Sequence, residues 1–285
     1  MTEDQVRELI RALEAKIRKE LRMRCEAYKP NFREPEVFNV LTALLARQAT
    51  LTIELASAPQ LWNGHSAPLF LRAMTDVHIT LSWICLDPTT RARQYIDHGL
   101  GQAVLALEHR KKEMEGVAAD SKEQLEKIIR GEEAWIDAQK WSFLVDVNVG
   151  SWSGKTTRQM AEEAGILEFY NHVYTPFTQC VHSTWYHVGR YNSWPSESPL
   201  TRQLWIPYIS EAKTDLWHLD LAAKYLDKSF SLFDEKALHR TPSSDIQDWI
   251  HNEIHSRFPS TAAAAEPPSD TDGAGDGNRI ASHNL

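Results

Sequence analysis

The stretch Leu69–Leu86, LFLRAMTDVHITLSWICL, is the best apolar run of the chain and decides its fold. It is preceded by Ser66, which can cap a helix, and by Pro68, which fits a first helical turn. Asp87-Pro88 then marks the end, because the residue before a proline avoids helical geometry. The stretch therefore predicts a largely buried helix over about 66–87.

Two charges interrupt this apolar run. Arg72 and Asp76 stand four residues apart, so they lie on one side of the predicted helix, one turn from each other. A charge within a buried helix is costly unless it finds a partner. Together with His78, these charges also make the run too polar for a membrane span. We therefore expect a facing element to supply further polar partners.

A second polar pattern lies further along the chain, where polar and aromatic residues recur at every fourth position. They are Tyr170, Tyr174, Thr178, His182 and Tyr186. This spacing places neighbours on one side of a helix, although each step overshoots a full turn by about 40°. We expect a helix over 167–188 to pack against the 66–87 helix, with Arg72, Asp76 and His182 in one cluster.

Nearly every other periodic segment has a helical period, so the sequence predicts an all-α protein, a multi-helix bundle of about seven to eight helices. One helical domain is expected over 1–257, and an acidic, disordered tail over 258–285. Gly165 and Pro176 divide or kink the sixth helical region, and Phe143–Val149 is either a short strand or a linker. The other expected helices span 2–28, 35–56, 90–116, 121–141, 156–188, 210–236 and 244–257.

Composition narrows the function classes. The net charge of −8 argues against binding to DNA or to an anionic membrane. Cys25, Cys85 and Cys180 are far apart, which argues against a disulfide framework and a thiolate zinc site. The first residues lack the apolar core of a signal peptide, so a cytoplasmic protein is expected. No cofactor and no metal is predicted.

Four short motifs do not support a specific activity. Gly150–Thr156 resembles a phosphate-binding loop, but only three residues separate its glycines where four are needed. Thr156–Gly165 could open a helix-turn-helix unit, but the next helix lacks basic residues for DNA. His251 and His255 lack a third metal ligand. The Arg-x(4–6)-His spacing of helical ribonucleases fits Arg72 and His78, which nevertheless differ by about 240° around a helix.

The chain resembles a large bacterial all-α family of unknown function. The resemblance covers roughly residues 40–235 and rests on an Arg-x-x-x-acid step and a later block of short motifs. They are Arg72–Asp76, Trp152, Gly154, Ala161–Gly165, Tyr170, Tyr174 and Thr178–His182. Asp76 stands where Glu is more usual, and Thr178 where Ser is. The resemblance implies an all-α intracellular protein and supplies no reaction.

Two interpretations of the polar cluster remain open. In the first, Arg72 pairs with Asp76, and His182 bonds to Tyr174 or a carbonyl, so the cluster only fixes helix register. In the second, the cluster lines a pocket in which Arg72 holds an anion and His182 moves a proton. The candidate site residues are therefore Arg72, Asp76, Tyr174 and His182.

The sequence thus predicts a cytoplasmic helical protein with a buried Arg–Asp–His–Tyr cluster. It would bind a small anionic ligand or a protein partner, and whether it is an enzyme stays undecided. The alternative is a metal-independent ribonuclease of the toxin or phage-defence type, which is an analogy by fold class. Such nucleases usually build their site across a dimer, so a homodimer is left open.

Overall fold

A computed structural model describes residues 2–114, 116, 119–143, 152–211 and 213–257. The expected strand or linker after Phe143 and the expected tail over 258–285 lie outside the described residues. One domain over 1–257 stays a prediction. The helices are α1 (Glu3–Ala27), α2 (Pro35–Ala56), η1 (Pro59–Leu61), α3 (Ala67–Ile84), α4 (Pro88–Met114), α5 (Ala119–Phe143), α6 (Thr157–Glu163), α7 (Leu167–Phe169), η2 (Tyr170–Tyr174), α8 (Thr175–Val181), α9 (Trp185–Tyr191), η3 (Pro199–Thr201), α10 (Trp217–Lys236) and α11 (Ile246–Arg257).

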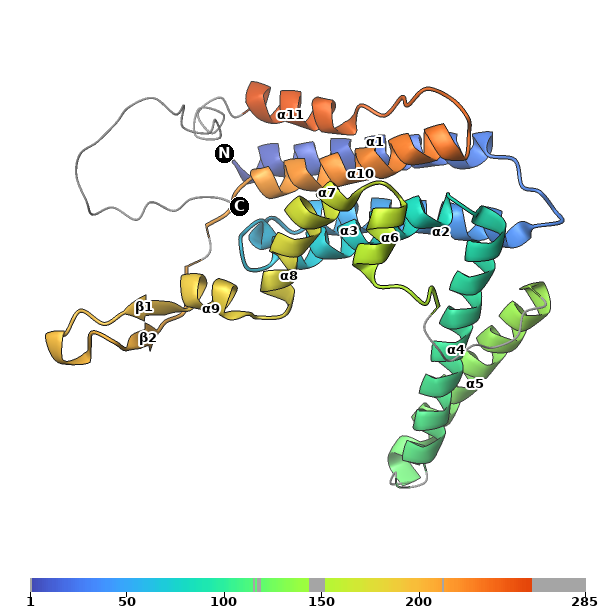
Figure 1. Ribbon diagram of the computed structural model, residues 1–285, viewed down its shortest axis with the longest axis horizontal. Helices are drawn as coiled ribbons and strands as arrows, with labels where there is room; N and C mark the ends of the chain where they lie inside the picture. The colour runs from blue at the N-terminus through green and yellow to red at the C-terminus, as the bar shows by residue number, and fades with distance from the viewer. Residues whose placement is uncertain (1, 115, 117–118, 144–151, 212, 258–285) are drawn as a thin grey trace.

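The predicted all-α class is confirmed, although the chain forms more helices than the seven or eight expected (Figure 1). The sole sheet of the described residues is a short antiparallel pair, β1 (Ser193–Pro195) and β2 (Trp205–Pro207). The excess arises mainly between 156 and 191, where one expected region is divided into several short helices.

The core lies where α2, α3 and α10 pack on one another, with α1 and α11 along the outer side (Figure 1). The apolar stripe of α10 is buried, from Leu219 through Leu226 to Phe230. Thr2 caps α1, because Thr2 and Gln5 exchange the hydrogen bonds of a capping box. The bundle is therefore assembled from the amphipathic faces that the sequence displays.

A buried ion pair ties α1 to α10. Arg24 donates to Asp234 over 2.7 Å, and both side chains are almost fully excluded from water. Arg24 also bonds Glu20 over 2.7 Å, while Asp234 accepts from Arg240 over 2.7 Å. Each charge has more than one partner, as a buried ion requires. Nothing local in the sequence indicates this pairing, because the partners lie 210 residues apart.

The segment around Pro176 stays nearly continuous. Gly165 adopts φ +71° after α6, as expected of a helix end. From Leu167 the chain then runs through the π-helical segment Tyr170–Tyr174 directly into α8. Pro176 lacks an N–H, and the wider π turn just before it accommodates this loss. The Thr175 hydroxyl donates to the Tyr170 carbonyl over 3.1 Å.

Two parts project from the body (Figure 1). The first is the antiparallel pair α4–α5, which has a small core of its own around Leu107, Ile129 and Ile136. The second is α9 with the β1–β2 hairpin, where rings such as Trp194 and Trp205 are exposed.

None of the helices in the described part of the chain combines the length and apolarity needed to cross a membrane.

Candidate functional site

The predicted pairing of Arg72 and Asp76 is present, and a facing helix completes it. Nη1 of Arg72 donates to the Asp76 carboxylate, and its Nε donates to Thr178 Oγ1 over 3.0 Å. The guanidinium also lies flat on the Tyr174 ring, with Cζ 3.3 Å from the ring centroid. Arg72 therefore joins α3 to α8 and to the π-helical segment before it. We call Arg72, Asp76, Tyr174 and Thr178 the arginine cluster.

The arginine cluster is only partly buried. The Arg72 side chain is 12% exposed, but that of Asp76 is 44% exposed. The pKa of the Asp76 carboxyl is raised because loss of hydration outweighs the attraction of Arg72. The pKa of the Tyr174 phenol is also raised, mainly by burial. The guanidinium already has an acid, a hydroxyl and a ring as partners, so little of it is free for an added anion.

His182 does not join this cluster, contrary to the prediction. It is the C-cap residue of α8 and is exposed. The helix ends after Val181, so the ladder of every fourth residue stops being a helix face at that position. Tyr186 falls on the separate helix α9. The expectation of a buried Arg–Asp–His–Tyr cluster is thus corrected to a half-buried Arg–Asp–Tyr–Thr set.

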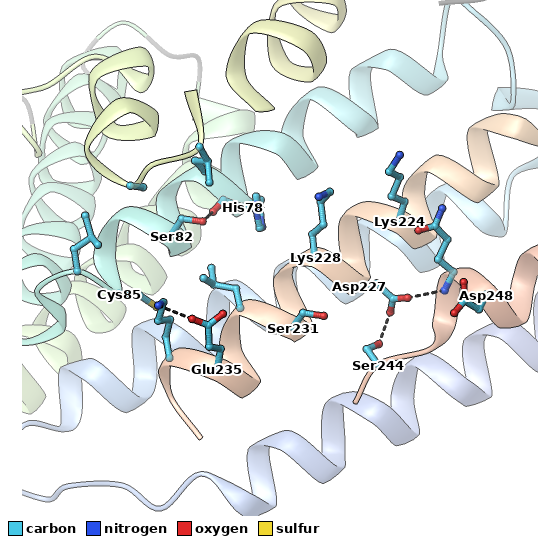
Figure 2. A pocket seen from close by; sticks show the side chains of 16 residues that line it. His78, Ser82, Cys85, Lys224, Asp227, Lys228, Ser231, Glu235, Ser244 and Asp248 are labelled. Carbon is cyan, nitrogen blue, oxygen red and sulfur yellow. Dashed lines mark hydrogen bonds and ion pairs between the residues drawn. The ribbon is translucent and has the colours of Figure 1, made fainter. Parts of the chain in front are cut away.

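A polar cavity lies on the other side of α3 from the arginine cluster (Figure 2). Its volume is about 620 Å³, within the range of small-molecule sites. His78, Ser82 and Cys85 of α3 form one wall, at the spacing of one helix face. The turn between α6 and α7, the outer side of α10 and the start of α11 form the others.

The charges around this cavity are unevenly paired. Lys224 and Lys228 stand one turn apart on α10 and extend from the same side of it (Figure 2). No carboxylate of the described chain forms an ion pair with either lysine. The acid between them in sequence, Asp227, is turned away: it accepts from the Ser244 hydroxyl and from the backbone N–H of Gln247 over 2.7 Å.

These bonds explain why Asp227 does not neutralise the lysines. It caps the first turn of α11, where the unpaired backbone N–H groups favour a negative charge. Glu235 likewise pairs with Lys236 over 2.6 Å. Of the acids that line the cavity, Asp248 is the one for which no such partner is seen among the described residues. The two lysines are therefore the cations best placed to attract an anion.

His78 and Cys85 are neutral at physiological pH. Burial, with a smaller contribution from Lys228, lowers the pKa of His78 to about 4. Its Nδ1 lies 3.1 Å from the Ser229 hydroxyl, and its ring packs edge-on against Phe169. Burial raises the pKa of the Cys85 thiol to about 12. A neutral imidazole and a protonated thiol suit binding better than proton transfer or nucleophilic attack.

The sequence interpretation missed this cavity. The spacing of Arg72 and His78 suggests a ribonuclease pair, but α3 directs the two side chains to different neighbours, as their separation of about 240° around the helix implies. Lys224 and Lys228 form an i,i+4 lysine pair, but Asp220 stands four residues before Lys224 and interacts with it, so the pair was only a weak signal. The lysines line the same cavity as His78 because of the way α10 packs against α3, and no local sequence pattern predicts that packing.

The sequence model of one protein family matches part of the chain that forms these sites. It matches residues 38–198, which is more than half of the chain and includes every residue of the arginine cluster. The chain belongs to DUF5677, a family of unknown function. The predicted resemblance to an unknown-function family is thus confirmed. The DUF5677 match covers the α3 wall of the cavity but ends before α10, so Lys224 and Lys228 lie outside it.

Comparison with curated proteins and with solved structures gives no match.

Proposed function

We propose that this protein binds a small anionic ligand in the polar cavity between α3, α10 and the start of α11. The observation that carries the proposal is the pair Lys224 and Lys228, which lacks ion-paired acids in the described chain and stands beside a cavity of about 620 Å³. Both lysines are exposed at the edge of the cavity, so they would act as two neighbouring surface charges whose field is focused by the cavity walls.

The rest of the lining supplies hydrogen bonds. The Ser231 hydroxyl and the neutral imidazole of His78 line the cavity and can orient a phosphate or carboxylate, whereas the Ser82 hydroxyl already donates to the His78 carbonyl over 2.7 Å. Each of these groups is uncharged, so the affinity would depend on the lysines and the orientation on the others. Within the proposal, the arginine cluster positions α8 and does not touch the ligand.

The ribonuclease alternative lacks a comparable observation. A ribonuclease of that type needs an arginine to hold the phosphate and a histidine to move the proton of the 2′-hydroxyl. Arg72 is occupied by Asp76, Thr178 and Tyr174, whereas His182 is exposed at the end of α8. The geometry therefore supports a binding site better than a nuclease centre.

Inorganic phosphate is a suitable first probe. We expect phosphate to raise the Tm of the wild-type protein relative to chloride at equal ionic strength. At a concentration of about 100 Kd the stabilisation is about 2.7 kcal/mol, or several degrees for a chain of this size. The double variant Lys224→Met, Lys228→Met should lose this response, because methionine keeps the length of the side chain and removes its charge.

Lys19→Met is the matched control, since Lys19 is an exposed lysine on α1, remote from the cavity lining. It should respond to phosphate as the wild type does. Equal responses of the wild type and the double variant would contradict the proposal. So would a phosphate response no larger than that to chloride.

A further inference from the structure

The projecting part formed by α9 and the β1–β2 hairpin carries an unusual amount of exposed apolar surface. We call residues 185–209 the apolar arm. Its exposed rings and aliphatic side chains are Trp185, Tyr186, Trp194, Leu200, Leu204, Trp205, Ile206, Tyr208 and Ile209. Between Ser193 and Ile209 the charged residues are Glu197 and Arg202 alone. Apolar patches of this extent on a soluble domain usually mark a contact surface.

The strand register divides these residues between two faces. Trp194 pairs with Ile206, so both side chains stand on one face of the hairpin. Trp205 pairs with Pro195 on the other face, where the centroid of its ring lies 6.1 Å from that of the Trp185 ring. Trp194 is 58% exposed, and among the described residues no ring packs against it. A lone two-stranded hairpin is marginally stable in water, so the Trp194–Ile206 face lacks the cover it needs.

The edges of the hairpin are poor templates for strand addition. Tyr208 donates its backbone N–H to Asn192 over 3.1 Å, and Ser196 donates to Leu204 over 2.9 Å. Bonded pairs alternate along an antiparallel ladder, so the pairs 193–207 and 195–205 have their nitrogens directed outward. Positions 195 and 207 are proline and have no N–H to donate. Each edge therefore lacks one of its two outward donors, which favours a partner that approaches a face.

We propose that the Trp194–Ile206 face packs against the same face of a second copy of this chain, forming a two-fold symmetric dimer. The charges of the arm favour a second copy over another protein. The hairpin part of the arm, residues 193–209, has one acid and one base, whereas the whole chain has a net charge of −8. A neutral face does not select an oppositely charged partner, and two identical apolar faces are complementary by symmetry.

The available area suits a weak dimer. On the Trp194–Ile206 face, Trp194 is 58% exposed, and Leu204, Ile206 and Tyr208 are 48%, 47% and 40% exposed. At roughly 150–250 Å² for each large side chain, these four leave on the order of 400 Å² in water. Leu200 and Ile209, outside the two strands, are 89% and 95% exposed and add to this area. The sum lies below the roughly 800 Å² per partner of a standard interface, as in weak complexes.

Sedimentation velocity of the full chain tests the proposal. Between about 1 and 100 μM, a range that spans common dimer affinities, the wild type should sediment increasingly as a dimer. Trp194→Glu and Ile206→Glu place a carboxylate on the proposed contact, facing its own symmetry mate. Each should weaken the dimer at least tenfold. Trp135→Glu is the matched control, since Trp135 is 53% exposed on α5, outside the arm.

Each other result would overturn the proposal. The contact would be excluded if the wild type stayed monomeric over the whole concentration range. It would also be excluded if the arm variants dimerised like the wild type, or if Trp135→Glu weakened the dimer as much as the arm variants do. Cosedimentation of the wild type with phosphatidylcholine vesicles, if Trp194→Glu abolished it, would exclude the contact as well, because the face would then bind lipid. Both arm positions are exposed, so native circular dichroism is expected, and if one variant fails to fold the other carries the test.

Discussion

At the scale of single residues, the two sides of α3 differ in what surrounds their polar groups. Asp76 is close to half exposed, so water still reaches part of its carboxylate, although partial loss of hydration raises its pKa. His78 is buried and neutral, and it keeps a hydrogen-bonding partner in Ser229. The two residues are separated by one position in sequence, yet one belongs to a surface pair and the other to the wall of a cavity.

For Asp76→Ala we expect a modest loss of stability, about 1 kcal/mol, as for an ion pair that water still reaches. Arg72 would keep its bond to Thr178 and its contact with the Tyr174 ring. Arg72→Met should cost more, about 2 kcal/mol, since it removes the bonds to Asp76 and Thr178 and the contact with the Tyr174 ring at once, although the Thr178 hydroxyl keeps its bond to the Tyr174 carbonyl. Urea unfolding of both variants measures the difference. A loss of several kcal/mol in Asp76→Ala would show that the carboxylate is effectively buried.

His78 gives stability a pH dependence of defined sign. Its pKa is lowered to about 4 in the folded protein and is near 6.5 when the chain unfolds. Between these values the unfolded chain binds the extra proton, so stability falls as pH falls through that window. From about pH 7 to pH 5, this residue alone should remove about 2 kcal/mol.

His78→Gln should flatten that slope, because glutamine has no proton to gain and its amide can still bond Ser229. The measurement is the free energy of unfolding of both proteins at each pH, with the difference between them as the readout. Other groups, such as Asp227 with its raised pKa, contribute equally to both proteins and cancel. Parallel pH profiles would mean that His78 is hydrated in the folded state.

At the scale of secondary-structure elements, local patterns predicted most of the helices. The capping box of Thr2 and the buried face of α10 follow from spacing alone. The π-helical turn before Pro176 could not be predicted from spacing, because the sequence shows where a proline must be accommodated but not how. The end of α8 before His182 was also missed, and that one boundary removed a candidate residue from the predicted cluster.

The candidate site was predictable only in part, and for a physical reason. Arg72 and Asp76 lie on one helix, so an i,i+4 rule finds them. Thr178 and Tyr174 come from a facing helix, and the polar ladder indicated that face. The cavity, by contrast, depends on α3, α10 and α11 meeting at particular angles, which nothing in their separate patterns specifies. Long-range packing decides which polar residues share a space.

At the scale of the whole molecule, stability should be unevenly distributed. The helices α2, α3 and α10 pack on one another and share one continuous core. The outer part of the α4–α5 pair has only a small cluster around Leu107, Ile129 and Ile136. Its other links include the ion pairs Arg110–Glu132 and Lys111–Glu133, which are half exposed. Exposed ion pairs contribute at most about 1 kcal/mol each, so this pair should open locally.

Hydrogen exchange can measure this difference directly. We expect amides in the outer half of α4–α5 to exchange at least tenfold faster than those of α10, because they need only a local opening. Ile136→Ala should accelerate exchange in the pair alone, whereas Leu226→Ala, in the main core, should accelerate it throughout α2, α3 and α10. The first variant removes contacts from a separate cluster, and the second lowers the free energy of global unfolding. Uniform acceleration by Ile136→Ala would mean that α4–α5 and the body unfold as one cooperative unit.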